Sequence, residues 1–414
     1  MKRLPAQTVW YLLEVMLSAP NFIITAVYFV REVHMSPLQL VLTGTVMEIV
    51  YFLSEIPTGA IADTYGRRVS LTVAFFITGG ATILVGSVAS FPVILVAWAI
   101  WGFGATFESG AYEAWITDEV GAENVGPVFL RGTRLSYLGA IAGLIASVGI
   151  GLWSLRAGVI FGGAITMLCG VICVLWMPET GFVRREHDPA VRRWREIART
   201  AGDGVRYVRA SHLLLLVLAI AFFAGMSSEA FDRLWEAHFI RDVGLPKLWS
   251  LDQVVWFGIF GVAVYAIGFV ASTYLIKRFT DAKPETLARL LFGMTAALMV
   301  SEIVFGAAGA ITLALCALLV ARAMRALVYP IWMTWLNGQI TDSSVRATVI
   351  SVTGQADAVG QAGGGPVLGA IGNGWGIRAA LIVGGLVLAP ALALYGRAIA
   401  HHGREPDLEP AVAP

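Results

Sequence analysis

The stretch Gly59-Ala-Ile-Ala-Asp63-Thr-Tyr-Gly66-Arg67-Arg68 separates two long apolar segments, which run over 38–62 and 69–89. Its two glycines allow helices to approach closely and the chain to turn tightly. Asp63 stands where the first segment ends, and a carboxylate at that place can accept hydrogen bonds from the N-terminal amides of a neighbouring helix. The pattern predicts a short charged turn between two membrane-spanning helices.

The composition of the whole chain agrees with this prediction. Of 414 residues, 57% are hydrophobic and 14% are charged, and the mean hydropathy is +0.74. Soluble domains carry about 25% charged residues, so a soluble enzyme is excluded. The net charge of +1 gives no reason to expect a nucleic-acid partner. At about 20 residues per span, the chain can hold roughly 12 membrane helices, and the expected fold class is all-α and integral to the membrane.

Apolar segments recur along the chain at the length of a membrane helix. They fall at 8–31, 38–62, 69–89, 92–115, 132–154, 157–177, 212–240, 250–276, 286–308, 311–338, 346–373 and 376–399. An arginine-rich polar stretch divides them six and six, and it is either an amphipathic helix on the membrane surface or a solvated linker. The predicted domains are an N-terminal six-helix bundle at 1–178, a basic cytoplasmic linker at 179–211, a C-terminal six-helix bundle at 212–400 and a cytoplasmic tail at 401–414.

The distribution of lysine and arginine predicts the orientation of the chain. If the N-terminus is cytoplasmic, the inner loops and termini carry 21 basic residues, and the outer loops carry five, which are Arg31, Arg156, Arg241, Lys247 and Arg378. The positive-inside rule then places both termini in the cytoplasm. The apolar run after Lys2-Arg3 is long and lacks a small-residue cleavage site, so we interpret it as the first span and not as a signal peptide. The expected location is the inner, cytoplasmic membrane of the cell.

Motifs of enzymatic chemistry are absent from the sequence. Cys169, Cys173 and Cys316 lie in apolar runs without a second ligand at metal-binding spacing, which indicates small buried side chains and no metal site. No G-x-x-x-x-G-K-[ST] phosphate loop, G-x-S-x-G or H-E-x-x-H occurs. We therefore expect neither catalysis nor a cofactor.

An internal repeat supports two equal halves. Arg131-Gly-Thr133-Arg-Leu-Ser136-Tyr-Leu-Gly139 and Arg346-Ala-Thr348-Val-Ile-Ser351-Val-Thr-Gly354 share the spacing R-x-T-x-x-S-x-x-G and open the fifth and eleventh spans. Leu95-Val-Ala-Trp98-Ala-Ile-Trp101 in the fourth span has a counterpart in the tenth, Leu319-Val-Ala-Arg322-Ala-Met-Arg325, although apolar stretches also match by chance. Two six-span halves in parallel repeat are the construction of the major facilitator type of transporter.

The charged turn resembles the loop signature of the major facilitator superfamily, G-x-x-x-D-x-x-G-R-R/K, and the resemblance covers essentially the whole chain. Further stretches are similar to its drug:proton antiporter branch, which contains macrolide and tetracycline exporters. They are Glu55-Ile-Pro57-Thr58-Gly59, Ser109-Gly-Ala-Tyr-Glu-Ala-Trp115 with Asp118-Glu119, and Ser228-Glu229-Ala-Phe-Asp232-Arg233-Leu-Trp235-Glu236. Two features depart from the branch. The fifth span lacks a Gly-Pro-Gly-Gly motif, and Trp98 stands where many relatives carry an arginine.

The resemblance implies a proton-coupled exporter of small amphiphilic compounds that works by alternating access. Its expected partners are the substrate, protons and the lipid bilayer, and it is expected to be a monomer. The predicted gating residues are Gly59, Asp63, Gly66, Arg67, Arg68 and Asp118. Arg67 would pair with Asp118 in one state and release it in the other; a static cytoplasmic loop is the alternative. A metabolite or solute transporter of the same fold, and more distantly a membrane receptor or enzyme, are the alternative functions.

Ionisable side chains inside spans cost roughly 2.5–3.5 kcal/mol each and mark functional sites. In the superfamily, spans one, four, seven and ten line the central cavity. The residues that this implies for the substrate cavity are Trp98, Trp101, Glu229, Asp232, Arg233, Glu236, Arg322 and Arg325. The two tryptophans would form a wall for planar amphiphiles. Alternatively, the acids of span seven and the arginines of span ten neutralise one another as a structural network.

A proton antiporter also needs a carboxyl group that gains and loses a proton near the working pH. Burial in an apolar span favours the protonated form of a carboxyl group, whereas an arginine neighbour favours the ionised form. Glu48 and Glu108 fit best, because their spans carry no basic residue. Asp357 is a third candidate, or it serves only helix packing. The alternative for the two glutamates is a permanently protonated acid that is hydrogen-bonded across helices.

Overall fold

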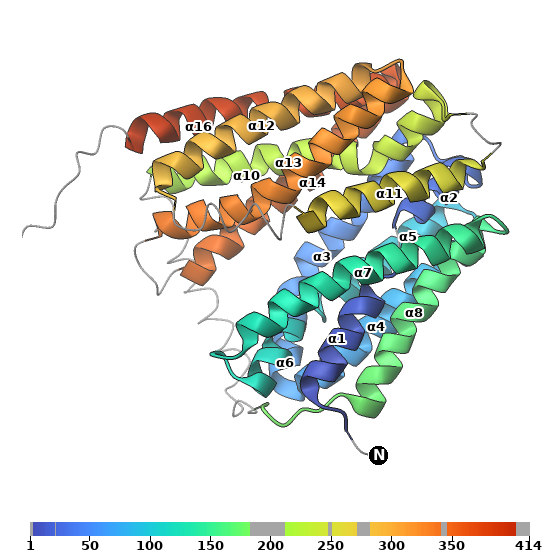
Figure 1. Ribbon diagram of the computed structural model, residues 1–414, viewed down its shortest axis with the longest axis vertical. Helices are drawn as coiled ribbons and strands as arrows, with labels where there is room; N and C mark the ends of the chain where they lie inside the picture. Colours follow the sequence, from blue (N-terminus) through green and yellow to red (C-terminus); the bar gives the residue numbers. More distant parts are fainter. Residues whose placement is uncertain are drawn as a thin grey trace, which may run out of the picture. The chain divides into compact units, whose positions relative to one another are not determined.

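The computed structural model describes residues 3–20, 22–182, 212–246, 251–270, 282–340 and 346–402. All regular structure in these ranges is helical, as the sequence predicts (Figure 1). The helices are α1 (Ala6–Leu17), α2 (Phe22–Arg31), α3 (Pro37–Tyr65), α4 (Arg67–Ser87), α5 (Phe91–Ala105), α6 (Ala111–Val120), α7 (Val125–Gly151), α8 (Leu155–Trp176), α10 (His212–His238), the short π-helix η1 (Phe239–Val243), α11 (Gln253–Val270), α12 (Pro284–Ala307), α13 (Ile311–Gln339), α14 (Arg346–Trp375), α15 (Ile377–Leu386) and α16 (Ala389–His402).

The chain divides into two compact units. The first is made of Met1–His187, Asp232–Phe269 and Gly365–Ile377, and it contains α1 to α8. The second is made of Asp188–Phe231, Val270–Gly364 and Arg378–Pro414. Most of the predicted linker and tail, at 183–211 and 403–414, lies outside the described residues.

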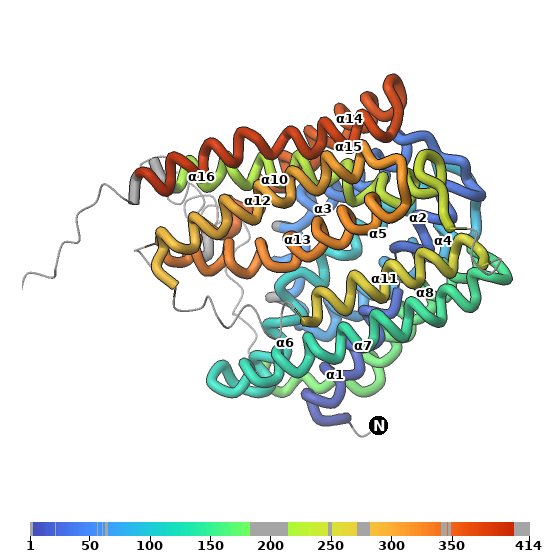
Figure 2. Tube along the Cα trace, turned by 45° about the horizontal axis from the view of Figure 1, so that its top comes forward, coloured from blue at the N-terminus to red at the C-terminus, as the bar shows by residue number. Residues whose placement is uncertain are grey.

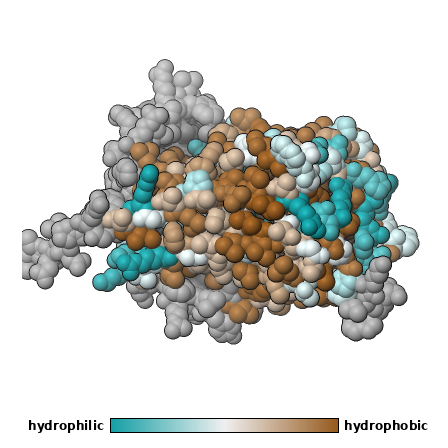
Figure 3. Space-filling view, turned by 90° about the horizontal axis from the view of Figure 1, so that it is seen from above, coloured by the Kyte–Doolittle hydropathy of each residue, from teal (hydrophilic) through white to brown (hydrophobic). Residues whose placement is uncertain are grey.

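Ten helical stretches among the described residues are long and apolar enough to cross a membrane, and they coincide with ten of the predicted spans. The other two predicted spans coincide with α5, which is apolar but has only 15 residues, and with α14, which is rich in glycine and contains Asp357. Large apolar side chains such as Val300, Val320 and Leu386 are exposed. Figure 3 shows apolar side chains over the middle of one face and hydrophilic ones toward its ends. This is the surface that a lipid bilayer requires.

The structure corrects the prediction of one continuous span at 92–115. α5 ends at Ala105, a turn follows over 106–110, and α6 begins at Ala111. Gly110, the residue before α6, has a φ of 70°, a left-handed conformation that favours glycine and that a continuous helix could not contain. Apolar periodicity could not show this break, because the residues on both sides of it remain apolar.

Two neighbouring helices satisfy the backbone of this turn. The hydroxyl of Thr58 in α3 donates to the carbonyl oxygen of Thr106 (3.1 Å), and the hydroxyl of Ser70 in α4 donates to that of Phe107 (2.7 Å). Carbonyl groups released from a helix at membrane depth must find other donors. The two hydroxyls are these donors, so side chains of α3 and α4 stabilise the break between α5 and α6.

Glycines bring helices into close contact in both units. In the first unit, a Cβ added to Gly139 of α7 would lie 2.3 Å from the carbonyl oxygen of Val15 in α1. In the second, a Cβ added to Gly360 of α14 would lie 2.1 Å from the carbonyl oxygen of Phe222 in α10. Small residues allow such backbone approach between membrane helices. Both α7 and α14 open with the sequence repeat, but their close contacts lie at different positions of it: Gly354, the counterpart of Gly139, has no described atom within 4 Å of its Cβ position.

The interior of the second unit is built around α12, which packs against both α13 and α16 (Figure 2). The rings of Trp335 in α13 and Tyr395 in α16 lie 5.9 Å apart, and both side chains are buried. Helices in proteins are stabilised mainly by packing against one another and not by helix propensity alone. The contact between Trp335 and Tyr395 therefore helps to hold α13 against α16.

Candidate functional site

Gly66 alone separates α3 from α4, and its φ is 106°. A Cβ on Gly66 would lie 2.7 Å from Oε1 of Glu179, so the position requires glycine both for its backbone angle and for space. The same carboxylate accepts a hydrogen bond from the backbone nitrogen of Arg68 (2.8 Å) in the first turn of α4. An acid therefore caps this helix at the end where the helix dipole favours negative charge.

Among the predicted gating residues, Gly59 lies within α3, and the side chain of Asp63 lies outside the described residues. Arg67 is the first residue of α4, Asp118 is exposed on α6, and α4 packs against α6. The pairing of Arg67 with Asp118 remains a prediction. The acid that does meet the amides of α4 is Glu179, which the sequence analysis did not single out.

A short segment after α8, which we call the strap (Met177–Gly181), binds the end of α6. Glu119 accepts hydrogen bonds from the hydroxyl of Thr180 (2.8 Å) and from the backbone nitrogen of Gly181 (2.7 Å). The indole nitrogen of Trp115 donates to the carbonyl oxygen of Pro178 (2.8 Å). The strap thus connects α6 with the charged turn through adjacent residues. No sequence spacing reveals this, because the partners are more than 60 residues apart.

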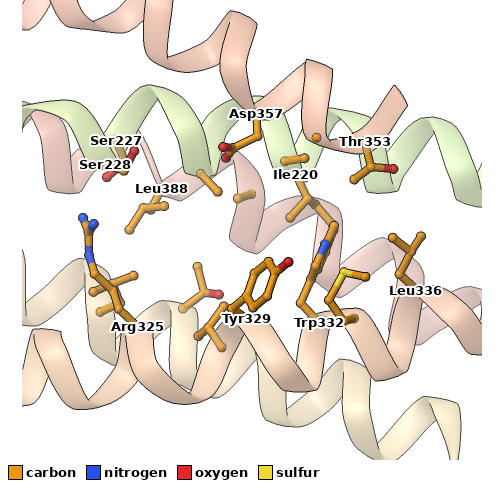
Figure 4. Close-up of a pocket in the computed structure, with 18 of the residues that line it drawn as sticks. Ile220, Ser227, Ser228, Arg325, Tyr329, Trp332, Leu336, Thr353, Asp357 and Leu388 are labelled. Atoms are coloured by element: carbon orange, nitrogen blue, oxygen red, sulfur yellow. The ribbon is translucent and has the colours of Figure 1, made fainter. Parts of the chain in front are cut away.

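A pocket of about 450 Å³ lies within the second unit (Figure 4). Side chains of α10, α12, α13, α14 and α16 line it, and all of these residues belong to the second unit. The lining includes Ile220, Ser227, Ser228, Arg325, Tyr329, Trp332, Leu336, Asp357 and Gln361. Small-molecule sites occupy about 300–1,000 Å³, so the pocket has the volume of a ligand site.

One face of α13 forms a wall of this pocket. Arg325, Tyr329, Trp332 and Leu336 follow one another at intervals of three or four residues, so they lie on the same side of the helix. Figure 4 shows them in this order along the wall. The wall therefore changes from a cation through two aromatic rings to an aliphatic side chain.

The facing part of α10 repeats this change of polarity. Ile220, Ala224 and Ser227 are spaced by four and three residues, and Ser228 adds a second hydroxyl. In Figure 4 the two serines lie toward the end that holds Arg325, and Ile220 lies toward the other. Two helices thus give the pocket one polar end and one apolar end.

Arg325 is held at the polar end by a buried acid. Its Nη2 atom lies 2.7 Å from Oε1 of Glu302 in α12. The hydroxyl of Ser227 donates to the other oxygen of the same carboxylate (3.1 Å). The side chain of Glu302 is 1% exposed and that of Arg325 is 20% exposed, so the acid lies behind the arginine. Sequence analysis gave Glu302 no role.

A single aromatic ring lies against both predicted arginines of span ten. The guanidinium carbons of Arg322 and Arg325 lie 5.2 and 4.9 Å from the ring centroid of Phe231. Contacts at this distance are favourable cation–π interactions. Arg325 lines the pocket and Arg322 does not, so the structure separates two residues that the sequence treated alike.

Asp357, predicted as a proton carrier, lines the same pocket from α14. The side-chain nitrogen of Gln361, one turn further on, donates to Oδ2 of Asp357 (2.7 Å). A Cβ added to Gly225 of α10 would lie 2.1 Å from the carbonyl oxygen of Asp357, so the two backbones touch here. The carboxylate is thus held at the pocket wall opposite Tyr329 (Figure 4).

The predicted acids and arginine of span seven lie on α10 with different exposure. Glu229 and Glu236 are buried, and Asp232 is exposed. The guanidinium of Arg233 lies against α3, where a Cβ added to Gly44 would come within 2.4 Å of its Nε. Glu48 follows Gly44 by one turn on the same face of α3. The guanidinium of Arg233, on α10, therefore lies within one helical turn of Glu48 on α3. The sequence of α3 alone could not reveal this basic neighbour.

Trp98 and Trp101 come together with Phe22 in the first unit. The rings of the two tryptophans lie 5.7 Å apart, and Phe22 lies 5.7 Å from Trp98 and 6.1 Å from Trp101. Trp98 is buried, whereas Phe22 is exposed. The cluster offers Phe22 and Trp101, rather than Trp98, to a ligand.

Glu108 lies in the turn between α5 and α6 and not in the middle of a helix. The charged groups that act on it are both acidic, Glu113 and Glu14. Glu14 of α1 in turn accepts a short hydrogen bond from the hydroxyl of Ser136 in α7. Three acids of the first unit are therefore neighbours, with a hydroxyl of the repeat motif beside them.

The amino-acid sequence matches the family model of the Major Facilitator Superfamily over residues 12–356. The chain belongs to this superfamily. A relative in Bacillus subtilis (strain 168), the uncharacterized MFS-type transporter YxaM, is 25% identical over 368 residues, which are 86% of each chain.

Solved structures of the superfamily share the fold over nearly the whole chain. The nucleoside transporter NupG gives a TM-score of 0.73 at 9% identity, covering 97% of this chain and 100% of that one. A bacterial homologue of the human lysosomal transporter Spinster gives 0.73 at 17%, covering 96% and 97%. A POT family transporter in complex with 5-aminolevulinic acid gives 0.74 at 13%, covering 96% of each. As a superfamily member, the chain is a secondary transporter in a membrane and not an enzyme.

Proposed function

We propose that this superfamily member is a proton-coupled exporter of small amphiphilic compounds, of the drug:proton antiporter branch, and that the pocket of the second unit holds its substrate. The observation that carries the proposal is the change of polarity along the pocket, from Arg325 and Ser227 at one end to Ile220 and Leu336 at the other (Figure 4). Polar groups cost free energy in an apolar site unless they are paired. A ligand with one polar and one apolar end satisfies both ends of the pocket.

The aromatic side chains between the two ends support a ligand with a flat or bulky body. Tyr329 is 69% exposed and Trp332 follows it on the same face of α13. Rings at such a position supply large apolar contact area and can stack on a planar group. The branch that the sequence resembles contains macrolide and tetracycline exporters, and both of these drug classes are amphiphilic.

Alternating access needs contacts that hold one state and break in the other. We assign this role to the charged turn, with Arg67 and Asp118 as the pair and Gly66 as the turn residue between α3 and α4. The strap and Glu179 support the turn from the side of α8. The proton would be carried by Glu48, Glu108 or Asp357.

The proposed location is the inner membrane of a bacterial cell, with both termini in the cytoplasm. The excess of lysine and arginine in the loops on one side supports this orientation. The bacterial origin of the YxaM relative supports the location. The alternative is a metabolite or solute transporter of the same fold, and it differs in direction or in substrate.

The proposal is tested in an efflux-deficient bacterium with and without expression of the full chain. A susceptibility panel that includes a macrolide and a tetracycline should show resistance only with expression. In inside-out vesicles from the same cells, an imposed pH gradient should drive drug accumulation that a protonophore abolishes. Accumulation driven by the gradient only in right-side-out vesicles would identify an importer and refute export.

A further inference from the structure

We infer that the preferred ligand of this pocket is a zwitterionic amphiphile, in which an anionic group binds Arg325, a cationic group binds Asp357 and an apolar body fills the rest. The inference rests on the proposal that this pocket holds the substrate. Among the described residues that line the pocket, two carry a formal charge, and they are Arg325 and Asp357. Their signs are opposite, and every other lining residue is neutral.

The two charges enter the pocket from different helices. Arg325 belongs to α13 and Asp357 to α14. Figure 4 shows Arg325 extending from the lower helix and Asp357 from the upper one, with Tyr329 on the lower wall between Arg325 and Trp332. A ligand lying along the aromatic wall would therefore meet a cation and an anion on separate sides.

Arg325 can bind a ligand anion without leaving Glu302. A guanidinium carries five N–H donors along more than one edge, and its planar fork matches the geometry of a carboxylate. Glu302 is bonded to Nη2 from behind, at 1% exposure, and so holds the guanidinium in place while its other side faces the pocket. The arginine is thus oriented before the ligand arrives, which lowers the entropic cost of binding.

Asp357 can likewise keep its neighbour and accept a ligand cation. An ionised carboxylate has about four lone-pair sites on two oxygens, and the hydrogen bond from Gln361 is on Oδ2. The close contact between Gly225 and the backbone of Asp357 keeps the residue at the pocket wall. A ligand ammonium group would find a fixed acceptor there.

A ligand of a single charge suits the pocket less well than a zwitterion. It would make only one of the two charge-assisted contacts that the pocket offers, and such contacts are about twice as strong as hydrogen bonds between neutral groups. A zwitterion pairs with both groups and adds no net charge to the membrane interior. Its apolar body contacts Trp332, Leu336 and Ile220.

The test uses one scaffold in four charge states. The purified full chain in detergent is titrated with radiolabelled 2-aminooctanoic acid, and three analogues compete: the N-acetyl acid (anion only), the amide (cation only) and the N-acetyl amide (neutral). We expect the zwitterion to bind about tenfold or more tightly than either single ion, since one charged hydrogen-bonded contact is worth at least this factor. The neutral analogue should bind most weakly.

Variants assign each charge to its residue. Asp357→Asn should abolish the preference for the ammonium group and leave the preference for the carboxylate. The double variant Arg325→Gln with Glu302→Gln, which keeps the buried pair neutral, should do the reverse. Arg289→Gln with Glu285→Gln is the matched control, because this ion pair lies on the surface of α12 (2.6 Å); it should change neither preference.

Equal binding of the zwitterion and the neutral analogue would overturn the inference, and so would the absence of binding by all four compounds. Equal binding of the zwitterion and the amide would also overturn it and would make Arg325 only a structural partner of Glu302. These outcomes leave export testable, because the drug panel and the vesicle assay do not depend on this scaffold. Conversely, if the four compounds bind in the predicted order but the vesicles show no proton-driven export, the proposed export function is refuted and the zwitterionic ligand class is retained.

Discussion

Glu302 is bonded to Arg325 across 2.7 Å, and the acid is almost completely buried while the arginine reaches the pocket. The second oxygen of Glu302 accepts from Ser227, so side chains of α10, α12 and α13 meet at one carboxylate. A buried carboxylate is tolerated only with such partners. The pair therefore has two roles: it stabilises the packing of α10, α12 and α13, and it positions Arg325 at the polar end of the pocket.

Breaking this pair on one side should destabilise the protein. For Arg325→Gln we expect a loss of about 3–5 kcal/mol in unfolding free energy, because an uncompensated buried charge remains at Glu302. Thermal unfolding in detergent would show it as a lower Tm. The double variant Arg325→Gln with Glu302→Gln should regain most of the Tm but not transport. If the single variant melts at the temperature of the parent protein, the pair does not support the fold.

The charged turn gives a second prediction, at Gly66. An alanine there must adopt a φ of 106° and place its Cβ 2.7 Å from Glu179. We expect Gly66→Ala to cost about 1–3 kcal/mol from backbone strain alone and to reduce transport. Gly59→Ala is the control, since among the described residues no atom lies within 4 Å of its Cβ position. Similar Tm values for the two variants would show that the turn accepts alanine at Gly66.

The gating role itself is tested at Asp63 and Arg67. Asp63→Asn or Arg67→Ala should abolish transport and leave substrate affinity within about fivefold, the low end of coupling between distant sites, because the turn belongs to the first unit and the pocket to the second. Drug transport in vesicles and binding to purified protein are measured on the same variants. Transport at the normal rate in either variant would contradict the gating role.

The fold could be predicted from the sequence because its strongest signals are long and local. Apolar segments of about 20 residues have few alternatives to membrane helices, and the repeat of Arg131 and Arg346 located the equivalent fifth and eleventh spans. The break after Ala105 could not be predicted, because it depends on hydroxyl groups of α3 and α4 that approach only in the folded chain.

The candidate site was predictable only in its residue types. Charges inside spans led to Arg325 and Asp357, which the structure brings to one pocket. The sequence did not indicate the partner of Arg325, because Glu302 lies on α12, 23 residues away, and no periodicity relates them. Glu179 was missed for the same reason, since its contact with α4 spans 111 residues.

The glycines of α14 give a prediction on packing. A Cβ at Gly360 would meet the carbonyl oxygen of Phe222 at 2.1 Å, a backbone atom that cannot rotate away. We expect Gly360→Ala to destabilise the second unit by about 1–3 kcal/mol, as overpacking does. For Gly363→Ala, whose Cβ position has no atom within 4 Å among the described residues, we expect an unchanged or slightly higher Tm, because alanine favours helix. If both variants unfold alike, the close contact of α10 and α14 is not required.

The last prediction concerns the coupling proton, and the structure separates its two leading candidates. The spans of both acids carry no basic residue of their own. Among the described residues, the charged groups that act on Glu108 are Glu113 and Glu14, both acidic. For Glu48 the guanidinium of Arg233 lies within one helical turn, against Gly44. Glu108 therefore fits the role of a reversibly protonated group better than Glu48 does.

We expect Glu108→Gln, which imitates the protonated acid, to bind substrate normally and to lose about tenfold or more of the transport that an imposed pH gradient drives, a factor within the usual range of coupling between two sites. Glu48→Gln should lose less. Glu123→Gln, in an exposed position after α6, is the matched control and should respond to the gradient like the parent. The measurement is drug accumulation in reconstituted vesicles at fixed substrate and varied pH difference. If Glu108→Gln follows the gradient as the parent does, the proton is carried elsewhere, and Asp357 at the pocket becomes the residue to test, because it alone of the three candidates lines the site where the substrate is proposed to bind.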